Sequence, residues 1–174
     1  MTIVNDKVTL NTAPAVIDEI GSAWVVHNPR FGAEGTHFHT YGLLTPYFKG
    51  LTEGKLRATR CINPACPVGH GHSDLWLPPR ADCPDCHQPM VWEQIENPCG
   101  YVYAFTHVAR GGTGLEIDCP YYQIDVKIDG VGTILKSYLV DREPIKIGDR
   151  VRARFHTGAN ATHTCLDLYW ELDR

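Results

Sequence analysis

Alternation of apolar and polar positions dominates the second half of the chain. This pattern predicts half-buried strands over residues 101–109, 122–128, 131–140, 150–156 and about 164–172. Asp129 and Gly130 stand between the second and third of these strands, and this dipeptide is a strong signal for a β-hairpin. Because no long helical pattern interrupts the five strands, we expect them to form one small closed barrel.

A short helix is predicted ahead of the barrel. Thr45 can cap it, Pro46 suits its first turn, and Gly54 suits its C-terminal end. Between these residues, apolar side chains recur at helical spacing. Residues 1–42 show no sustained pattern, so an N-terminal arm with only local structure is expected there.

Four cysteines in two pairs lie between the helix and the barrel. Four residues separate Cys61 from Cys66, and two residues separate Cys83 from Cys86. Two such hooks on a proline-rich connection can place four thiolates around one tetrahedral metal ion, and zinc suits a closed all-sulfur site. We therefore predict one structural zinc ion per chain, bound in a rubredoxin-like zinc ribbon.

Disulfides and a redox-active pair are the alternatives for these cysteines. Met1–Leu10 does not resemble a signal peptide, so we expect a cytoplasmic protein with reduced thiols. A thioredoxin-like pair at Cys83 and Cys86 would need a helix after it, and the HQP segment that follows is a poor helix start. Zinc binding is the favoured interpretation.

The expected fold is mainly β. The N-terminal arm would cover residues 1–42, the helix and zinc ribbon residues 43–97, and a five-stranded oligonucleotide/oligosaccharide-binding barrel (OB-fold) residues 98–174. A length of 174 residues is enough for one ordinary core and a small additional module. No apolar run reaches the roughly 20 residues that a membrane-spanning helix needs.

The charge balance bears on possible partners. The formal net charge is −4, whereas proteins that bind nucleic acids generally carry a basic surface. Aromatic residues in the predicted strands could nevertheless stack on bases, namely Tyr101, Tyr103, Phe105, Tyr121 and Tyr122. A module that binds single-stranded nucleic acid is therefore the alternative to the function inferred next.

The order of these elements resembles a known family. The sequence is similar to zinc-ribbon/OB-fold proteins associated with acyl-CoA enzymes, through the segments YFKGLTEGKLRATRC, GYVYAFTHVAR and IKIGDRVRARF and the four cysteines. The resemblance covers about residues 43–172. It implies a non-catalytic partner of a thiolase-superfamily or retro-aldol enzyme. Of these, we expect an accessory subunit that docks to a thiolase-type catalytic subunit in a hetero-oligomer. Coenzyme A or an acyl-CoA would then be a substrate of the complex.

The chain departs from that family's usual pattern in three places. The first cysteine pair is more widely spaced, and residues 1–42 are an additional segment. The connection between the two pairs is longer and contains His70 and His72, either of which could replace Cys66 as a ligand. Because four thiolates already complete a tetrahedral site, the four cysteines remain the predicted ligands.

No catalytic residue is predicted. Cys99, Cys119 and Cys165 lie outside the ribbon, and none has a recognisable nucleophile context. The histidines are scattered, so spacing indicates no Cys–His pair. We expect these three cysteines to be small buried or edge side chains and expect the chain alone to lack thiolase activity.

Alternate arginines offer a candidate for anion binding. Arg150, Arg152 and Arg154 point to one face of their predicted strand, where they could bind the phosphates of coenzyme A or an acidic partner surface. Arg110, in a glycine-rich loop, is a further candidate. The alternative is a solvent-exposed strand face with nearby carboxylates such as Asp167 and Glu171.

Overall fold

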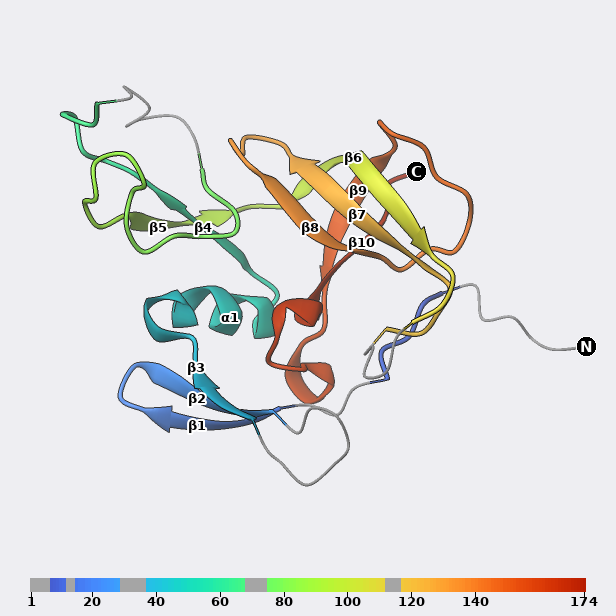
Figure 1. The fold of residues 1–174 in the computed structure, drawn as a ribbon, viewed down its shortest axis with the longest axis horizontal. Helices are drawn as coiled ribbons and strands as arrows, with labels where there is room; N and C mark the ends of the chain where they lie inside the picture. Colours follow the sequence, from blue (N-terminus) through green and yellow to red (C-terminus); the bar gives the residue numbers. More distant parts are fainter. Residues whose placement is uncertain (1–6, 12–14, 29–36, 68–74, 112–116) are drawn as a thin grey trace, which may run out of the picture.

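The computed structural model describes residues 7–11, 15–28, 37–67, 75–111 and 117–174. It is mainly β with one α-helix, as predicted. The named elements are β1 (Val16–Ile20), β2 (Ala23–Asn28), β3 (His37–Thr40), α1 (Thr45–Thr52), β4 (Leu56–Arg60), β5 (Val91–Ile95), β6 (Cys99–Val108), β7 (Tyr121–Ile128), β8 (Ile134–Leu139), β9 (Arg150–Phe155) and β10 (Leu168–Leu172). Short 3-10 turns cover Gly42–Leu44, Gly158–Asn160 and Cys165–Asp167. Figure 1 shows α1 between the N-terminal sheet below it and the β4–β5 hairpin above it, with the barrel to one side.

The predicted five-stranded barrel is confirmed. Its strands close in the order β10-β8-β7-β6-β9, and the pairing is antiparallel except between β10 and β8. Alternate residues of β7, including Ile124 and Val126, point into the barrel, where they are fully buried beside Trp170. The period-2 pattern therefore identified the barrel's interior correctly.

Two details of the barrel differ from the sequence-based prediction. The hairpin turn is at Asp129 and Gly130 as expected, and Gly130 has a φ of 76°, but β8 begins only at Ile134. The last strand begins at Leu168, because Cys165–Asp167 form a 3-10 turn. The Thr164 hydroxyl stabilises this turn by accepting a hydrogen bond from the backbone N–H of Leu166, at 3.1 Å. A local side-chain contact of this kind competes with strand formation.

The predicted helix is present, but Thr45 does not cap it. Thr45 is the first helical residue, and its hydroxyl donates a hydrogen bond to the carbonyl of Gly42 at 2.7 Å. At the other end Gly54 has a φ of 76°, and its N–H donates to the carbonyl of Leu51 at 3.0 Å, which is the predicted glycine stop. Leu51 is fully buried in the same core as the barrel interior.

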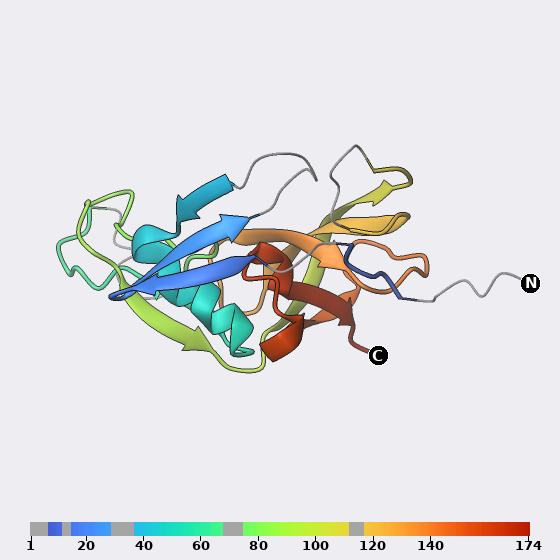
Figure 2. The ribbon, with the colours of Figure 1, turned by 90° about the horizontal axis from the view of Figure 1, so that it is seen from below.

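Residues 16–40 contain an antiparallel sheet with the order β1-β2-β3, where the sequence predicts only local structure. Trp24 and Val26 of β2 are buried and pack with Ala15 near Phe48 of α1. The sheet is held to the rest of the chain by backbone and side-chain hydrogen bonds, including one from the Tyr41 hydroxyl to the carbonyl of His163, at 2.6 Å. Figure 2 shows this sheet beside α1 from a second direction.

Among the described residues, no helix is long and apolar enough to span a membrane.

Candidate metal centre and adjoining cleft

The first pair of cysteines lies at the end of β4. This strand pairs with β5 as an antiparallel hairpin and leads directly into Cys61. The chain then turns at Asn63, whose side-chain oxygen accepts a hydrogen bond from the N–H of Ala65 at 3.0 Å. The carbonyl of Asn63 accepts a second hydrogen bond, from the N–H of Cys66 at 3.1 Å. These contacts fold the four-residue spacer so that both thiols face the same point.

The second pair lies on a tighter turn. The carbonyl of Cys83 accepts a hydrogen bond from the N–H of His87 at 2.9 Å, and the N–H of Cys83 donates to the carbonyl of Gln88 at 2.9 Å. His87 has a φ of 57°, so the backbone reverses in the left-handed region just after Cys86. This is a turn and not a helix start, in agreement with the argument against a thioredoxin-like pair.

The four cysteine sulfurs meet in one cluster. They all lie within 4.8 Å of one another, with Sγ–Sγ distances of 3.7 Å between Cys61 and Cys86 and 3.9 Å between Cys66 and Cys83. Four sulfurs bound about 2.3 Å from a tetrahedral zinc ion lie about 3.8 Å apart. The cluster therefore has the size and the ligand set of a structural zinc site.

The four cysteines lie in a largely buried setting. Cys61, Cys66 and Cys83 are buried, and Met90 and Trp76 pack around them. Hydrogen bonds from the Asn63 side chain and, with a smaller effect, from the Gln88 backbone lower the pKa of Cys86 to about 6. A metal ion in the cluster would favour ionisation of all four thiols.

His70 and His72 lie outside the described residues, so the structure does not address their role as alternative ligands. Four sulfurs are nevertheless already gathered without them.

Hydrogen bonds fix the ribbon to the barrel at the β7–β8 hairpin. The N–H of Gly132 donates to the carbonyl of Leu75 at 2.9 Å. The Thr133 hydroxyl donates to the carbonyl of Leu77 at 2.5 Å and accepts from the N–H of Leu77 at 2.8 Å. Leu77 is itself fully buried in the main core. The four-cysteine cluster is thus connected to the barrel through a short buried segment.

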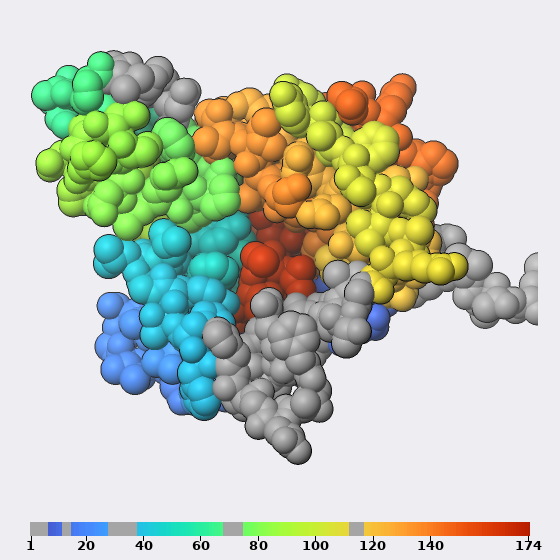
Figure 3. Space-filling model, viewed as in Figure 1, coloured from blue at the N-terminus to red at the C-terminus, as the bar shows by residue number. Residues whose placement is uncertain are grey.

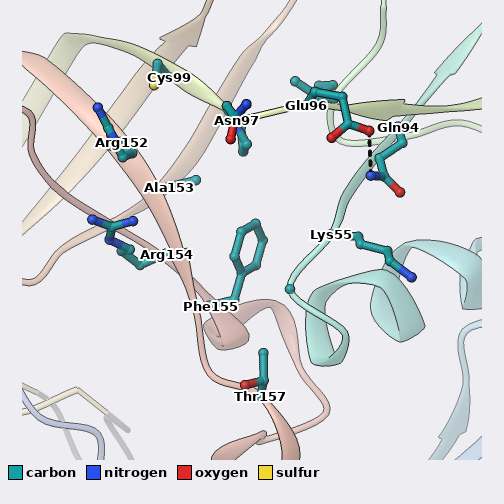
Figure 4. A pocket seen from close by; sticks show the side chains of 13 residues that line it. Lys55, Gln94, Glu96, Asn97, Cys99, Arg152, Ala153, Arg154, Phe155 and Thr157 are labelled. Carbon is teal, nitrogen blue, oxygen red and sulfur yellow. Dashed lines mark hydrogen bonds between the residues drawn. The ribbon is translucent and has the colours of Figure 1, made fainter.

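A cleft of about 630 Å³ opens where the base of the β4–β5 hairpin meets β9. Residues from both elements line it, among them Lys55, Gln94, Glu96, Arg152, Arg154 and Phe155. In the view of Figure 4, the two arginines lie on one side of the Phe155 ring and the hydrogen-bonded pair of Gln94 and Glu96 on the other. Sequence reasoning did not find this cleft, because nothing in the sequence indicates that residues of β5 and β9 line one cavity.

The cleft contains two of the four arginines that the sequence singles out. Arg152 and Arg154 line it, whereas Arg150 and Arg110 are not among its lining residues. Arg152 pairs with Asp173 at 2.8 Å, and Nε of Arg154 pairs with Glu171 at 2.7 Å. Exposed ion pairs of this kind contribute little to stability.

Arg150 forms a separate ion pair at the edge of the barrel. Its guanidinium contacts both carboxylate oxygens of Asp129, at 2.6 and 3.2 Å. The hydrogen bond from Arg150, together with its charge, lowers the pKa of Asp129 below the ordinary value. All three strand arginines therefore contact carboxylates, but only Glu171 is one of the two carboxylates named from the sequence. Asp167 instead accepts hydrogen bonds from the backbone N–H groups of Thr162 and His163.

The remaining cysteines are spread over the barrel. Cys99 lines the cleft at the start of β6, Cys119 is half-buried near Ile117, and Cys165 is exposed in the 3-10 turn. They lie in three different elements and form no cluster with one another.

Comparison with known proteins agrees with this architecture. Residues 92–156 match a family described as the C-terminal OB-fold domain of ChsH2. Among curated proteins, none matches the chain.

Two solved structures share the fold. The first is a protein of unknown function from the DUF35 family of Sulfolobus solfataricus, which is 17% identical, with a TM-score of 0.52 over 76% of this chain and 87% of that one. The second is the Ltp2–ChsH2(DUF35) aldolase, 24% identical, with a TM-score of 0.55 over 72% of this chain and 91% of that one. These similarities confirm the predicted OB-fold resemblance.

Proposed function

We propose, from the similarity of the barrel to the OB-fold domain of ChsH2, that this chain is a non-catalytic accessory subunit of a thiolase-type enzyme complex. It would dock to the catalytic subunit and help to form or order the acyl-CoA site. The observation that carries the proposal is a four-cysteine ribbon fused to an OB-fold barrel, with a cleft at their junction that Arg152 and Arg154 line. The structural relative that pairs a DUF35 protein with Ltp2 in an aldolase supports the idea of a catalytic partner.

Zinc would have a structural role in this subunit. Cys61, Cys66, Cys83 and Cys86 would hold it, and a closed four-sulfur shell has no open position for water or substrate. Bound zinc stabilises the ribbon and, through Leu77 and Thr133, its attachment to the barrel. The chemical groups for thiolysis would come from the partner.

The cleft is the proposed contact for coenzyme A. Arg152 and Arg154 offer guanidinium groups that suit phosphate oxygens, and the Phe155 ring offers an apolar wall between them and the ribbon. Arg110 and Arg150 remain predicted phosphate contacts that lie outside this cleft.

For the substrate we propose benzoylsuccinyl-CoA, which with coenzyme A would give benzoyl-CoA and succinyl-CoA. The support is the resemblance of the sequence to the zinc-finger subunit of benzoylsuccinyl-CoA thiolase, from anaerobic toluene degradation.

The partner is tested by affinity purification of the tagged chain from its native cells. We expect a stoichiometric thiolase-type subunit and one zinc ion per chain, measured by mass spectrometry and metal analysis. The purified complex should cleave a β-keto acyl-CoA, whereas the chain alone should not. Recovery of the chain alone, or with nucleic acid, would contradict the proposal and favour the nucleic-acid-binding alternative.

The coenzyme A contact is tested by Arg152→Gln in the assembled complex. Loss of one charge-assisted hydrogen bond should weaken coenzyme A binding by about tenfold, as measured by calorimetric titration. Arg60→Gln is the control, because Arg60 also pairs with a carboxylate, that of Glu93, but lies outside the cleft and is not a predicted phosphate contact. Equal affinities for both variants and the unmodified complex would remove the cleft from the proposal.

A further inference from the structure

One edge of β6 lacks a strand partner over half of its length. The neighbouring β9 pairs only with Cys99–Tyr101, and Val102 then exchanges hydrogen bonds with Gly148 and Asp149. Beyond this point, no other strand of the described residues pairs with that edge of β6, although β7 continues along the opposite edge as far as Val108. Figure 1 shows β6, in yellow, as the outermost strand of the β8-β7-β6 layer.

The open edge is exposed and uncharged. Phe105, Thr106 and His107 are all exposed, and Tyr103 is 52% exposed. Figure 3 shows atoms of this yellow segment on the surface of the molecule. Soluble proteins usually protect such an edge with charged side chains or proline, and neither occurs between Tyr103 and Val108. A bulge at Tyr103 is followed by five regularly paired residues.

We propose that this edge pairs with the same edge of a second copy of the chain, in an antiparallel arrangement around a two-fold axis at Thr106. When two copies of one strand pair in this way around a two-fold axis perpendicular to the sheet, one residue must lie opposite the same residue of the other copy. Thr106 is the centre of the regularly paired segment Ala104–Val108 and is therefore placed on the axis. The pairing would join the two barrels into one continuous sheet across the interface.

Side-chain chemistry favours a second copy as the occupant. With Thr106 on the axis, Phe105 faces His107 of the second copy, and Ala104 faces its Val108. Directly opposed like charges would destabilise self-pairing, and this segment has no Lys, Arg, Asp or Glu. The segment Ala104–Val108 is therefore complementary to the same segment of a second copy.

Phe105, His107 and Tyr122 form an aromatic cluster on the inner side of this edge. Tyr122 of β7 contacts the rings of Phe105 and His107, with centroid distances of 5.8 and 5.1 Å. Pairing would bring the Phe105 and His107 rings of the second copy against this cluster. Aromatic cross-strand pairs stabilise sheets, and aromatic residues are enriched at interfaces. This inference does not depend on the proposed function.

The test uses the full chain and its sedimentation behaviour. We expect a species of twice the 19.4 kDa chain mass, measured by analytical ultracentrifugation. Thr106→Lys would place two ammonium groups face to face across the axis, so the dimer should be lost. Gln123→Lys is the matched control, because Gln123 lies opposite Thr106 on β7, away from the open edge. That variant should remain dimeric.

A charge-pairing experiment separates the interface from a folding defect. Thr106→Glu alone should also be monomeric, while an equimolar mixture of Thr106→Lys and Thr106→Glu chains should restore the dimer. Recovery in the mixture requires that both variants are folded and meet at position 106. A monomeric unmodified chain, a dimer indifferent to Thr106→Lys, or a mixture that stays monomeric would each overturn the proposal.

Discussion

Single residues shape the two hooks that carry the four cysteines. Cys61 and Cys86 are 25 positions apart in the sequence, yet their sulfurs lie 3.7 Å from one another. Asn63 shapes the first hook by accepting two backbone hydrogen bonds, and the left-handed backbone at His87 closes the second. The chemistry of the ligands is therefore local, whereas their meeting requires the β4–β5 hairpin.

The role of the cluster is tested by Cys83→Ser. The loss of one thiolate should reduce zinc content to well below one ion per chain and unfold the ribbon, because zinc-binding energy is folding energy in such modules. Metal analysis and limited proteolysis between residues 61 and 91 measure the two effects. Cys165→Ser is the control, since Cys165 is exposed and lies outside the cluster. A Cys83→Ser chain with full zinc content would contradict the assignment.

Close packing between neighbouring strands shapes the barrel at the level of its elements. Gly100 of β6 lies against β7, and an added Cβ would be 2.4 Å from the carbonyl oxygen of Lys127 and 2.9 Å from Cα of Ile128. Because both of these atoms belong to the backbone, a side chain at this position requires the strands to move apart. The glycine is needed here for space and not for an unusual φ.

Gly100→Ala is expected to lower the free energy of unfolding by about 1–3 kcal/mol, as overpacking generally does. Gly130→Ala provides a comparison in the same sheet, because nothing lies within 4 Å of its added Cβ and only the positive φ opposes the change. That cost should be about 1 kcal/mol. Urea denaturation of both variants measures the difference, and a smaller loss for Gly100→Ala would contradict the steric argument.

At the scale of the whole molecule, the ribbon, the N-terminal sheet and the barrel are joined by contacts between distant segments. Thr133 binds both backbone polar groups of Leu77, and the N–H of Ala15 donates to the carbonyl of Thr162 at 3.1 Å. Val8 and Lys7 are likewise held near the β8–β9 connection, through hydrogen bonding to Val140 and an ion pair with Asp141. The domain limits at residues 42 and 97 stay predictions.

Thr133→Val tests the attachment of the ribbon. Valine has a similar shape but leaves the N–H and C=O of Leu77 without their partner, which should cost about 1–3 kcal/mol of stability. Zinc content should not change, while amide hydrogen exchange over residues 75–77 should become faster.

Ser137→Ala is the control for that change, because its hydroxyl donates to the carbonyl of Leu168 within the barrel. It should reduce stability without faster exchange over residues 75–77. Unchanged exchange in the Thr133→Val chain would show that other contacts hold the ribbon in place.

The sequence by itself determined the four-cysteine cluster, the helix stop at Gly54, the hairpin at Gly130 and the five barrel strands. Each of these features depends on the chemistry of a few adjacent residues, or on the alternation of apolar and polar residues within one segment, and both can be read from the sequence. The same local reasoning misjudged Thr45 as a cap and extended the last strand through Cys165, because short-range hydrogen bonds decided both places.

Only the tertiary structure decided the N-terminal sheet, the cleft and the open edge of β6. The cleft depends on residues of β5 and β9 lining one cavity, and the open edge depends on where β9 stops pairing with β6. Such contacts join segments that are far apart in the chain. Which segments meet, and over how many residues, therefore follows from the packing of the whole molecule and cannot be predicted from a local sequence pattern.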